Sequence, residues 1–432
     1  MKNKNVATGW RKVLCIAALL IFATTESLYA QRIVPAPPQD SIVILTNGRA
    51  HIGNGQVIEN SAIGFEKGRI TFVADATTVR LDLTGARVID VGGKDVYPGL
   101  ITPNSELGLR EIEAVRATVD KAEVGQFNPA VRSLTSYNTD SRVVPTVRAN
   151  GVLLAQVAPA GGVVSGTSSI VQLDAWNWED AAYKTDDGVW LTWPFYNPFK
   201  PEEQDKYKQQ VTSIELFFNQ SKAYRNGALP EKNVQFEAMK GLWQGEQKLF
   251  IRASTSYQIT AAVLFARKMN LRCVIVGGEE SYKTLDVLKQ NNVSVILNRV
   301  QSLPLTPDDD YDQPYKTPAV LQQNGILFSM SMDVFWQDRN QPFNAGHAAG
   351  FGLTPEQALS SVTMNAAKIL GIDDRTGTLE AGKDANIVVS TGDILDMRTN
   401  NVELAFIQGR QILLTDKQKQ LYEIYKKKYR LD

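Results

Sequence analysis

The stretch that decides the fold class is residues 272–298, which read RCVIVGGEESYKTLDVLKQNNVSVILN. An apolar run that ends in two glycines is followed by a helix-like segment and then by a second apolar run. A strand, a helix and another strand in such close succession are typical of a parallel α/β fold. The same alternation predicts further strands at 151–159, 189–195, 248–254 and 325–331, and helices at 202–224, 235–243, 257–268 and 355–371.

The alternating region extends from residue 98 to about residue 370. Its length fits a (β/α)8 barrel, which typically takes about 250 residues. The pattern alone does not place all eight strands, so a doubly wound sheet remains the alternative. On either side, residues 41–89 and 377–414 carry short β-rich runs that end in Gly or Asn-Gly, and these runs predict a small β-domain.

The composition narrows the possible function classes. The 432 residues are 43% hydrophobic and 21% charged, with 46 Lys and Arg balanced by 46 Asp and Glu. This balance argues against a nucleic-acid-binding protein, which normally carries a basic excess. Two cysteines cannot build a disulfide scaffold or a Cys-rich zinc module. The sequence has two histidines, His51 and His347, so a metal site that relies on several imidazoles cannot be assembled from this chain.

The first thirty residues have the features of an export signal. Four cations precede the apolar run VLCIAALLIFA (13–23), which is too short to cross a bilayer as a helix. Ala30 then supplies a small residue at a cleavage position before Gln31. We therefore predict a secretory signal peptide over residues 1–30 and an exported protein, periplasmic or extracellular. A buried N-terminal helix is the alternative. The sequence has no second apolar run long enough to span a membrane.

The C-terminal segment 415–432 ends in DKQKQLYEIYKKKYRLD and predicts a basic amphipathic helix. Its lysines are interpreted as a solvated face. Membrane-surface binding is the alternative, and it is less favoured because the apolar face of Leu421, Ile424 and Tyr425 is narrow.

Two further motifs have plain structural interpretations. The Gly-rich run APAGGVVSGTSS (158–169) lacks the Gly-Lys-Ser/Thr of a phosphate loop, and we predict a loop after a strand. The tryptophans Trp176, Trp178, Trp190 and Trp193 predict core or loop packing, with an aromatic platform for a ligand as the alternative.

Two segments resemble the amidohydrolase superfamily, and specifically its imidazolonepropionase-like branch. They are GKDVYPGLITPNSELGL (93–109) and GLTPEQALSSVTMNAAKILGIDDRTGTLEAGKDANIVV (352–389). The resemblance implies a (β/α)8 barrel with a small β-sandwich built from the chain before and after it. The implied organisation is a sandwich from residues 31–95 and 372–414, a barrel over 96–371 and the C-terminal helix at 415–432.

Enzymes of this superfamily hydrolyse C–N and related bonds with one or two divalent metal ions, zinc or another metal, that activate a water. The resemblance implies metal-ligating histidines at the carboxyl ends of barrel strands. At those positions this chain has Asn104 and Glu106 after the first strand, and Arg252 and Gly277 on later strands. Asp333 stands where the resemblance implies an aspartate that acts as ligand and base. The bridging ligand of the fourth barrel strand has no identifiable counterpart.

These substitutions predict a site without a metal cofactor. A neutral asparagine is a weak ligand, and a guanidinium is always cationic and cannot coordinate a metal. We expect Arg252 to pair with Glu106 or Asp333. Asp333 is the candidate catalytic residue, with an inert carboxylate as the favoured alternative. The candidate substrate-binding residues are Asn104, Glu106, Arg252, Gly277 and His347, the last because its loop should lie at the barrel mouth, although a packed histidine is the plainer interpretation.

Three functions are compatible with this reasoning. The first is a non-catalytic member that binds a partner or ligand, and the partner we expect is a related amidohydrolase chain with an intact site, within an oligomer. The second is a C–N bond hydrolase with an atypical single-metal or metal-poor site that uses Asp333 and Glu106. The third is an exported small-molecule-binding protein that uses the barrel mouth. No nucleic-acid partner and no integral membrane span are expected.

Overall fold

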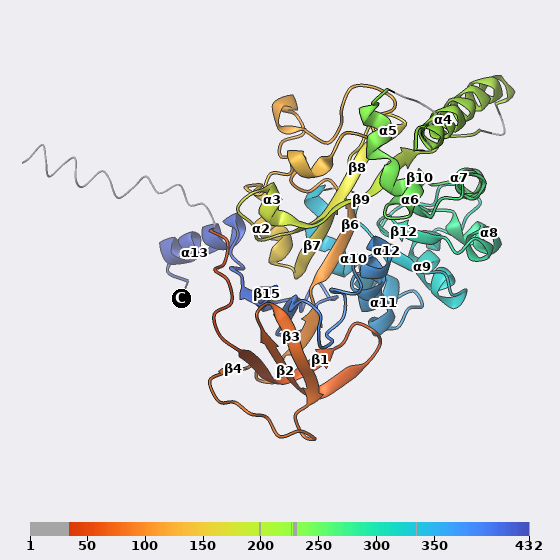
Figure 1. Cartoon of the computed structure of the whole chain (residues 1–432). Helices are drawn as coiled ribbons and strands as arrows, with labels where there is room; N and C mark the ends of the chain where they lie inside the picture. The colour runs from red at the N-terminus through yellow and green to blue at the C-terminus, as the bar shows by residue number, and fades with distance from the viewer. Residues whose placement is uncertain (1–33, 198–199, 226, 228–230, 334, 432) are drawn as a thin grey trace, which may run out of the picture. The chain divides into compact units, whose positions relative to one another are not determined.

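The computed structural model describes residues 34–197, 200–225, 227, 231–333 and 335–431. The chain divides into two units, Met1–Val34 and Pro35–Asp432. The predicted signal peptide over residues 1–30 lies outside the described residues. The second unit contains two eight-stranded sheets. Figure 1 shows helices beside these sheets.

The sheet formed by strands β6 to β13 is called the larger sheet below. It is nearly closed, and its strands follow one another in chain order. Its strands are β6 (Leu100–Ser105), β7 (Val152–Val157), β8 (Val164–Gln172), β9 (Ala182–Thr192), β10 (Lys248–Ala253), β11 (Cys273–Gly277), β12 (Ser294–Leu297) and β13 (Phe328–Met330). Neighbouring strands are parallel except β8, which runs antiparallel to both β7 and β9. The end strands β6 and β13 contact each other.

The mixed α/β fold predicted from the sequence is confirmed, but two details of the prediction are wrong. Residues 164–172 form strand β8, where a glycine-rich loop was expected. As a result, β7, β8 and β9 follow one another as antiparallel neighbours, and the strict alternation of strand and helix is interrupted there. The glycines of this run allow sharp turns at the start of the strand, and such turns resemble a loop in sequence.

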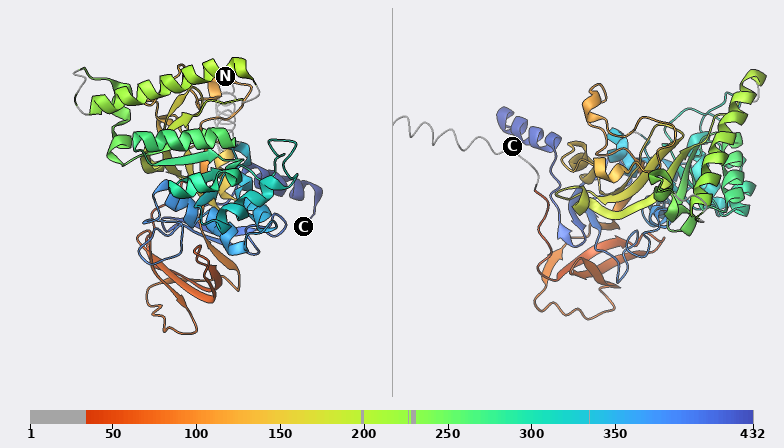
Figure 2. Two further views of the ribbon diagram at one scale, coloured as in Figure 1. Left: turned by 90° about the vertical axis from the view of Figure 1, so that its right-hand side faces the viewer. Right: turned by 45° about the horizontal axis from the view of Figure 1, so that its top comes forward.

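The helices lie mostly along the outer side of the larger sheet (Figure 2). The α-helices are α2 (Val143–Arg148), α3 (Trp178–Ala181), α4 (Gln204–Arg225), α5 (Val234–Ala238), α6 (Lys240–Gln244), α7 (Ser256–Met269), α8 (Leu285–Gln290), α9 (Gln313–Gln323), α10 (Gln341–Ala349), α11 (Pro355–Ser361), α12 (Met364–Leu370) and α13 (Lys417–Tyr429). Short 3-10 turns include η5 (Ser281–Lys283) and η6 (Phe335–Asn340). The prediction missed α2, α3, α9 and α10.

Local sequence explains where the helices begin and break. Thr255 caps α7 through a reciprocal pair of hydrogen bonds with Gln258, which satisfies free backbone donors of the first turn. The predicted helix 355–371 is divided into α11 and α12 at Val362 and Thr363. Both residues are β-branched, and the Thr363 hydroxyl donates to a backbone carbonyl, so this point disfavours a continuous helix.

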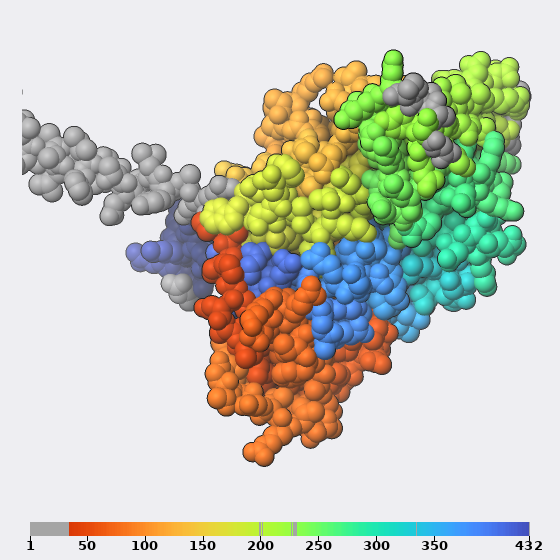
Figure 3. Space-filling view, in the orientation of Figure 1, coloured from red at the N-terminus to blue at the C-terminus, as the bar shows by residue number. Residues whose placement is uncertain are grey.

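The second sheet is built from both ends of the unit. Its strands are β1 (Val43–His51), β2 (Val57–Glu66), β3 (Arg69–Asp75), β4 (Arg87–Asp90), β5 (Asp95–Pro98), β14 (Ile387–Ser390), β15 (Val402–Ile407) and β16 (Arg410–Gln411). β14 pairs with β5 and so joins the early and late parts of the chain, which lie side by side in Figure 3. A second sheet that takes strands from both the early and the late part of the unit agrees with the expectation, and its pairings connect all eight strands into one sheet. Irregular pairing near Thr46 and Gly48 lets β1 contact β2, β4 and β5 along its length.

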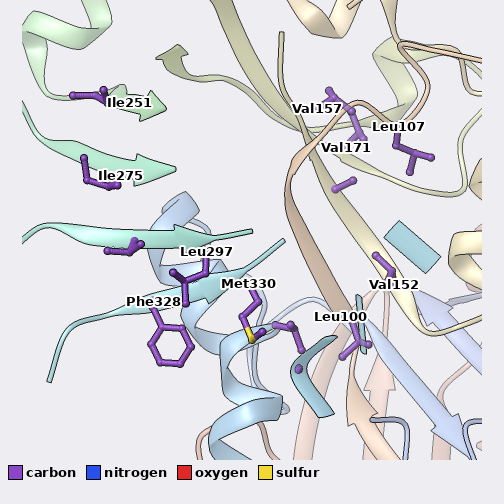
Figure 4. Close-up of a cluster of buried hydrophobic side chains, with 14 of the residues drawn as sticks. Leu100, Leu107, Val152, Val157, Val171, Ile251, Ile275, Leu297, Phe328 and Met330 are labelled. Atoms are coloured by element: carbon purple, nitrogen blue, oxygen red, sulfur yellow. The ribbon is translucent and has the colours of Figure 1, made fainter. Parts of the chain in front are cut away.

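Successive side chains on the strands of the larger sheet enter two different cores. Figure 4 shows the outer core, in which Ile251, Ile275 and Leu297 lie on the neighbouring strands β10, β11 and β12. On the inner face, Phe250 of β10 stacks on Trp190 of β9 with ring centroids 5.0 Å apart. Helix α12 contributes apolar side chains to this inner core. The inner face of β10 is therefore buried between strands and a helix.

The tryptophan cluster is divided between core and surface. Trp190 and Trp193 are buried, which confirms the packing interpretation for this pair. Trp178 packs against the outer core, and Trp176 is 50% exposed. Among the residues that the structure describes, no helix combines the length and apolar character needed to cross a membrane.

Candidate functional site

The first two candidate residues lie where β6 ends. Asn104 has a left-handed backbone with φ of 51°, and its N–H donates to Oε1 of Gln156 on β7 at 3.2 Å. Glu106 contacts two cations: Lys121 Nζ lies 2.9 Å from its Oε1, and Arg110 Nη2 lies 3.4 Å from its Oε2. The carboxylate of Glu106 is therefore neutralised by residues that follow it closely in the sequence.

Arg252 lies on the inner face of β10, two residues after Phe250 and on the same side of the strand. Its Nη2 donates to the backbone O of Pro159 at 2.8 Å, and its Nη1 donates to Oγ of Ser165 at 3.4 Å. Its Cζ lies 4.3 Å from the ring centroid of Trp190. Burial lowers the pKa of Arg252 to about 10, although the negative charge of Glu106 acts in the opposite direction.

The predicted pairing of Arg252 with Glu106 or Asp333 is wrong. Within the described parts of the chain, no carboxylate forms an ion pair with this guanidinium, whose hydrogen-bond acceptors are a carbonyl and a hydroxyl. Glu106 is already held by the two cations of its own segment. A carbonyl acceptor and the face of an indole ring stabilise a cation without a counter-ion.

Gly277 ends β11 in a conformation that side chains rarely adopt. Its φ is 99°, and a Cβ atom built there would lie 3.0 Å from Oε2 of Glu279 and 3.4 Å from the backbone O of Ala253. Both the backbone and the neighbouring atoms therefore disfavour a side chain at this position. A histidine cannot occupy position 277 without local rearrangement.

Asp333 follows β13, with φ of 54° and a side chain that is 32% exposed. Its nearest cation is Arg299, whose Nε lies 3.9 Å from Oδ1. Burial raises the pKa of Asp333 in spite of Arg299, and the negative charges of Glu279 and Glu106 add to this increase. Asp333 is thus a partly exposed carboxylate whose charged form is disfavoured mainly by burial.

His347 lies on α10 and is held by its own helix. Its Nδ1 lies 2.7 Å from the backbone O of Phe343, so Nδ1 carries the proton and donates. The other ring nitrogen lies 3.1 Å from the side-chain Nε2 of Gln301, which donates to it. The structure brings neither His347 nor His51 into contact with the other candidate residues.

Sequence reasoning missed a buried carboxyl, Asp338 of η6. It is 1% exposed and accepts hydrogen bonds from the hydroxyls of Ser105 and Thr102 on β6. Burial raises its pKa to about 7, against the effect of the two hydroxyls. Because η6 follows β13, these bonds connect the two end strands of the larger sheet. No pattern around FWQDRN (335–340) indicates this role.

A second missed group lies inside the sheet. Asp187 of β9 accepts hydrogen bonds of 2.7 Å from both Gln156 Nε2 and Ser168 Oγ. Burial raises the pKa of Asp187 to about 6 although both bonds favour the charged form. The chain of bonds continues through Gln156 to the backbone of Asn104. A polar residue inside the apolar strand GVLLAQVAP (151–159) is the sequence signal that could have revealed it.

The residues at the expected ligand positions do not fit a divalent metal ion. Across the described ranges, no three His, Cys, Asp or Glu side chains are grouped closely enough to share a metal. Zinc sites use three or four strong donors. Of the five positions, only Glu106 and Asp333 supply a donor of that type, and Glu106 is already engaged by Lys121 and Arg110.

Comparisons with known proteins agree with this architecture. A sequence profile of the Amidohydrolase family matches residues 320–412. Imidazolonepropionases from Bacillus thuringiensis (strain Al Hakam) and Bacillus cereus (strain B4264) are each 50% identical to the chain over 60 residues, which is 13% of this chain and 14% of each relative. The matched segment therefore spans about one seventh of the length of these curated relatives.

Solved structures extend the likeness to most of the chain at the level of the fold. An amidohydrolase from Thermotoga maritima MSB8 superposes with a TM-score of 0.76 at 22% identity, covering 86% of this chain and 99% of that one. An adenosine deaminase from Xanthomonas campestris superposes with a TM-score of 0.54 at 14% identity, covering 91% and 99%.

Residues 320–412 are thus similar to the amidohydrolase family, and the fold of most of the chain is similar to that of a solved amidohydrolase. Within that class, the segment shared with the imidazolonepropionases supports the imidazolonepropionase-like branch. The resemblance stated from the sequence is therefore confirmed.

Proposed function

We propose that this chain is an exported amidohydrolase-family protein whose metal site has decayed and which binds a partner or ligand without hydrolysing it. The larger sheet is interpreted as a (β/α)8-type barrel in which β8 is reversed. The carboxyl ends of its parallel strands form the mouth at which members of such folds bind their ligands. The ancestral activity would be hydrolysis of non-peptide C–N bonds.

The observation that carries the proposal is the guanidinium of Arg252 on the inner face of β10. It stands where the family resemblance implies an imidazole, and it is fixed there by Pro159, Ser165 and Trp190. A fixed cation a few ångströms from a divalent ion would repel it by several kcal/mol, even at an effective dielectric constant of about 20. The residue at this expected ligand position, Arg252, therefore repels a divalent metal ion.

A recess beside Gly277 supports ligand binding at the mouth. Its lining includes Glu279, Asn298 and Arg299, which follow β11 and β12. Two buried oxygens in it, Oε2 of Glu279 and Oδ1 of Asn298, have no hydrogen-bond partner among the described residues. Buried acceptors without partners are rare in proteins, and a ligand with N–H donors would satisfy them. The recess has a volume of about 30 Å³, so this observation favours a ligand that places one donor group of about the size of a water molecule there.

The proposed partner is a related amidohydrolase chain that retains its metal ligands, in an oligomer with this chain. The support is that the scaffold around the altered site is intact. The side chains of the inner core are buried, and Asp338 is hydrogen-bonded to β6, which connects the two end strands of the larger sheet. The competing proposal is a hydrolase with one weakly held metal that uses Asp333 and Glu106. The accessibility and raised pKa of Asp333 favour it.

An activity assay separates the two proposals. The purified chain, Asp333→Ala and the exposed control Asp308→Ala are incubated with a slight excess of zinc and assayed for cyclic-amide hydrolysis. We expect all three to show only the background rate, because two carboxylates do not provide the ligands of a catalytic metal. Zinc-dependent turnover that Asp333→Ala abolishes and Asp308→Ala keeps would contradict the non-catalytic proposal and support the metal-poor hydrolase.

Export is tested separately at the N-terminus. A basic segment, a short apolar run and Ala30 predict cleavage between residues 30 and 31. Mass spectrometry of the protein recovered from the cell envelope or medium should find Gln31, or a close neighbour, as the first residue. An intact Met1 on that protein would contradict export through a cleaved signal.

A further inference from the structure

Helix α13 is exposed to solvent along its length. None of its residues is buried, and the Thr146 hydroxyl of α2 donates a hydrogen bond of 3.5 Å to Oε1 of Gln418. The helix begins at a defined point, because the buried Asp416 accepts a hydrogen bond from the backbone N–H of Lys419 at 2.8 Å. Figures 1 and 2 show it at the edge of its unit, away from the strands.

The exposed surface of α13 is apolar on one side. The apolar side chains on and just after the helix are 40% to 67% exposed, and they are Leu421, Tyr422, Ile424, Tyr425, Tyr429 and Leu431. At about 100° per residue, those of the helix itself fall within roughly half of its circumference. This arc is wider than the face of three residues that the sequence indicated, because the structure leaves Tyr422 and Tyr429 exposed as well.

The opposite side of α13 is basic. Lys419, Lys426 and Lys427 lie there, and with Lys417, Lys428 and Arg430 they bring residues 417–431 to six cations against one anion, Glu423. The rest of the chain then holds 40 cations and 45 anions, so positive charge is concentrated at this end. A helix with one apolar side and one lysine-rich side matches the boundary between acyl chains and anionic headgroups.

Composition favours a lipid surface over a protein partner. Lysine is depleted in protein–protein interfaces, whereas it is the common cation of helices that lie on membranes. Tyrosine suits the level of the headgroups, where its ring is buried and its hydroxyl stays hydrated. We propose that α13 docks the protein on an anionic lipid surface, with the apolar arc inserted and the cations of the helix attracted by the surrounding anionic headgroups.

The test uses residues 31–432, which contain the whole compact unit and lack the N-terminal apolar run. The protein is floated with vesicles of phosphatidylcholine alone or of phosphatidylcholine with phosphatidylglycerol. The charge variant combines Lys419→Gln, Lys427→Gln and Arg430→Gln. The apolar variant combines Leu421→Ser and Ile424→Ser.

The matched control removes three exposed lysines elsewhere, through Lys67→Gln, Lys206→Gln and Lys208→Gln. Circular dichroism establishes that each variant is folded. We expect binding to the anionic vesicles alone, weakened at least about tenfold by high salt or by the charge variant, because each cation near the surface adds to the attraction. The apolar variant should also lose binding, and the lysine control should keep it.

Three results would overturn the proposal. One is no binding to anionic vesicles. Another is equal binding by the charge variant and the unaltered protein. The third is self-association that the charge variant abolishes in a protein that ignores lipid, which would assign α13 to contact with a second copy of the chain.

Discussion

Replacing Asp174 by alanine is expected to lower the free energy of unfolding by about 3–5 kcal/mol. Asp174 lies just after β8 and is 2% exposed. Its Oδ1 accepts a hydrogen bond from Arg148 of α2, and its Oδ2 lies 3.0 Å from Nη1 of Arg410 on β16. The backbone N–H of Ala36 donates to the same Oδ2 at 2.9 Å. One carboxylate therefore joins the larger sheet, the second sheet and the start of the unit.

The cost arises from the cations that the substitution leaves behind. The side chain of Arg148 is 4% exposed and that of Arg410 is 14% exposed. Burial already lowers the pKa of Arg148, and the attraction of Asp174 only partly offsets that effect. Removing one partner of a buried ion pair is costly because the remaining charge is neither hydrated nor neutralised.

Urea unfolding of Asp174→Ala beside Asp396→Ala measures the effect. Asp396 pairs with Arg398, whose side chain is 85% exposed, and such a surface pair contributes little to stability. We expect no measurable change from Asp396→Ala. Equal stability of the two variants would show that the buried pair does not hold the two sheets together.

The second large effect is a loss of stability between pH 6.5 and pH 9 that depends on His51. The His51 ring stacks on Tyr97 with centroids 4.6 Å apart, its Nδ1 lies 2.6 Å from Oε1 of Glu356 on α11, and its Nε2 lies 3.5 Å from Oδ1 of Asp95. Burial acts to lower the pKa of His51, but the two carboxylates outweigh burial and raise the pKa from 6.5 to about 9.

A pKa that is higher in the folded state means that protonated His51 stabilises the fold. This contribution is fully present below pH 6.5 and is lost as the pH rises to 9, with a total of about 3 kcal/mol. His51→Gln should lack this dependence. Asp95 remains paired with Arg49 at 2.6 Å in that variant, so the variant differs mainly at Glu356.

The test is to measure the free energy of unfolding of the unaltered protein and of His51→Gln at several pH values. The difference between the unaltered protein and His51→Gln isolates the contribution of His51 from other groups that titrate in this range, such as Lys248, whose pKa burial lowers to about 8. The difference should shrink steadily from pH 6.5 to pH 9. A difference that stays constant over this range would show that His51 is not protonated in the folded protein at neutral pH.

The fold could be predicted in outline because its signals are local. The run of residues 272–298 contains a strand, a turn, a helix and a strand in order, and the structure has β11, η5, α8 and β12 there. The small residues that mark the start of β8 concealed a strand, because glycine serves both turns and irregular strands. Which strands pair, and that β8 is reversed, depends on contacts between distant residues.

The candidate site could be predicted by position but not by contact. The family resemblance located Arg252, yet its acceptor Ser165 lies in β8 and its acceptor Pro159 lies just before β8, the strand that the sequence did not reveal. Glu106 was expected to meet Arg252, but Lys121 lies closer because the segment after β6 folds back on itself. Which cation pairs with a given carboxylate depends on distances in the folded protein, and the sequence pattern does not contain these distances.

The zinc content of residues 31–432, measured after dialysis against a slight excess of zinc, tests whether this chain lacks a metal site. Arg252→His is measured beside the unaltered protein, because it introduces an imidazole and removes the opposing cation. We expect far less than one zinc per chain for both proteins, since Gly277 and Asn104 still supply no strong ligand and affinity depends on the complete set. One tightly held zinc per unaltered chain would contradict this expectation.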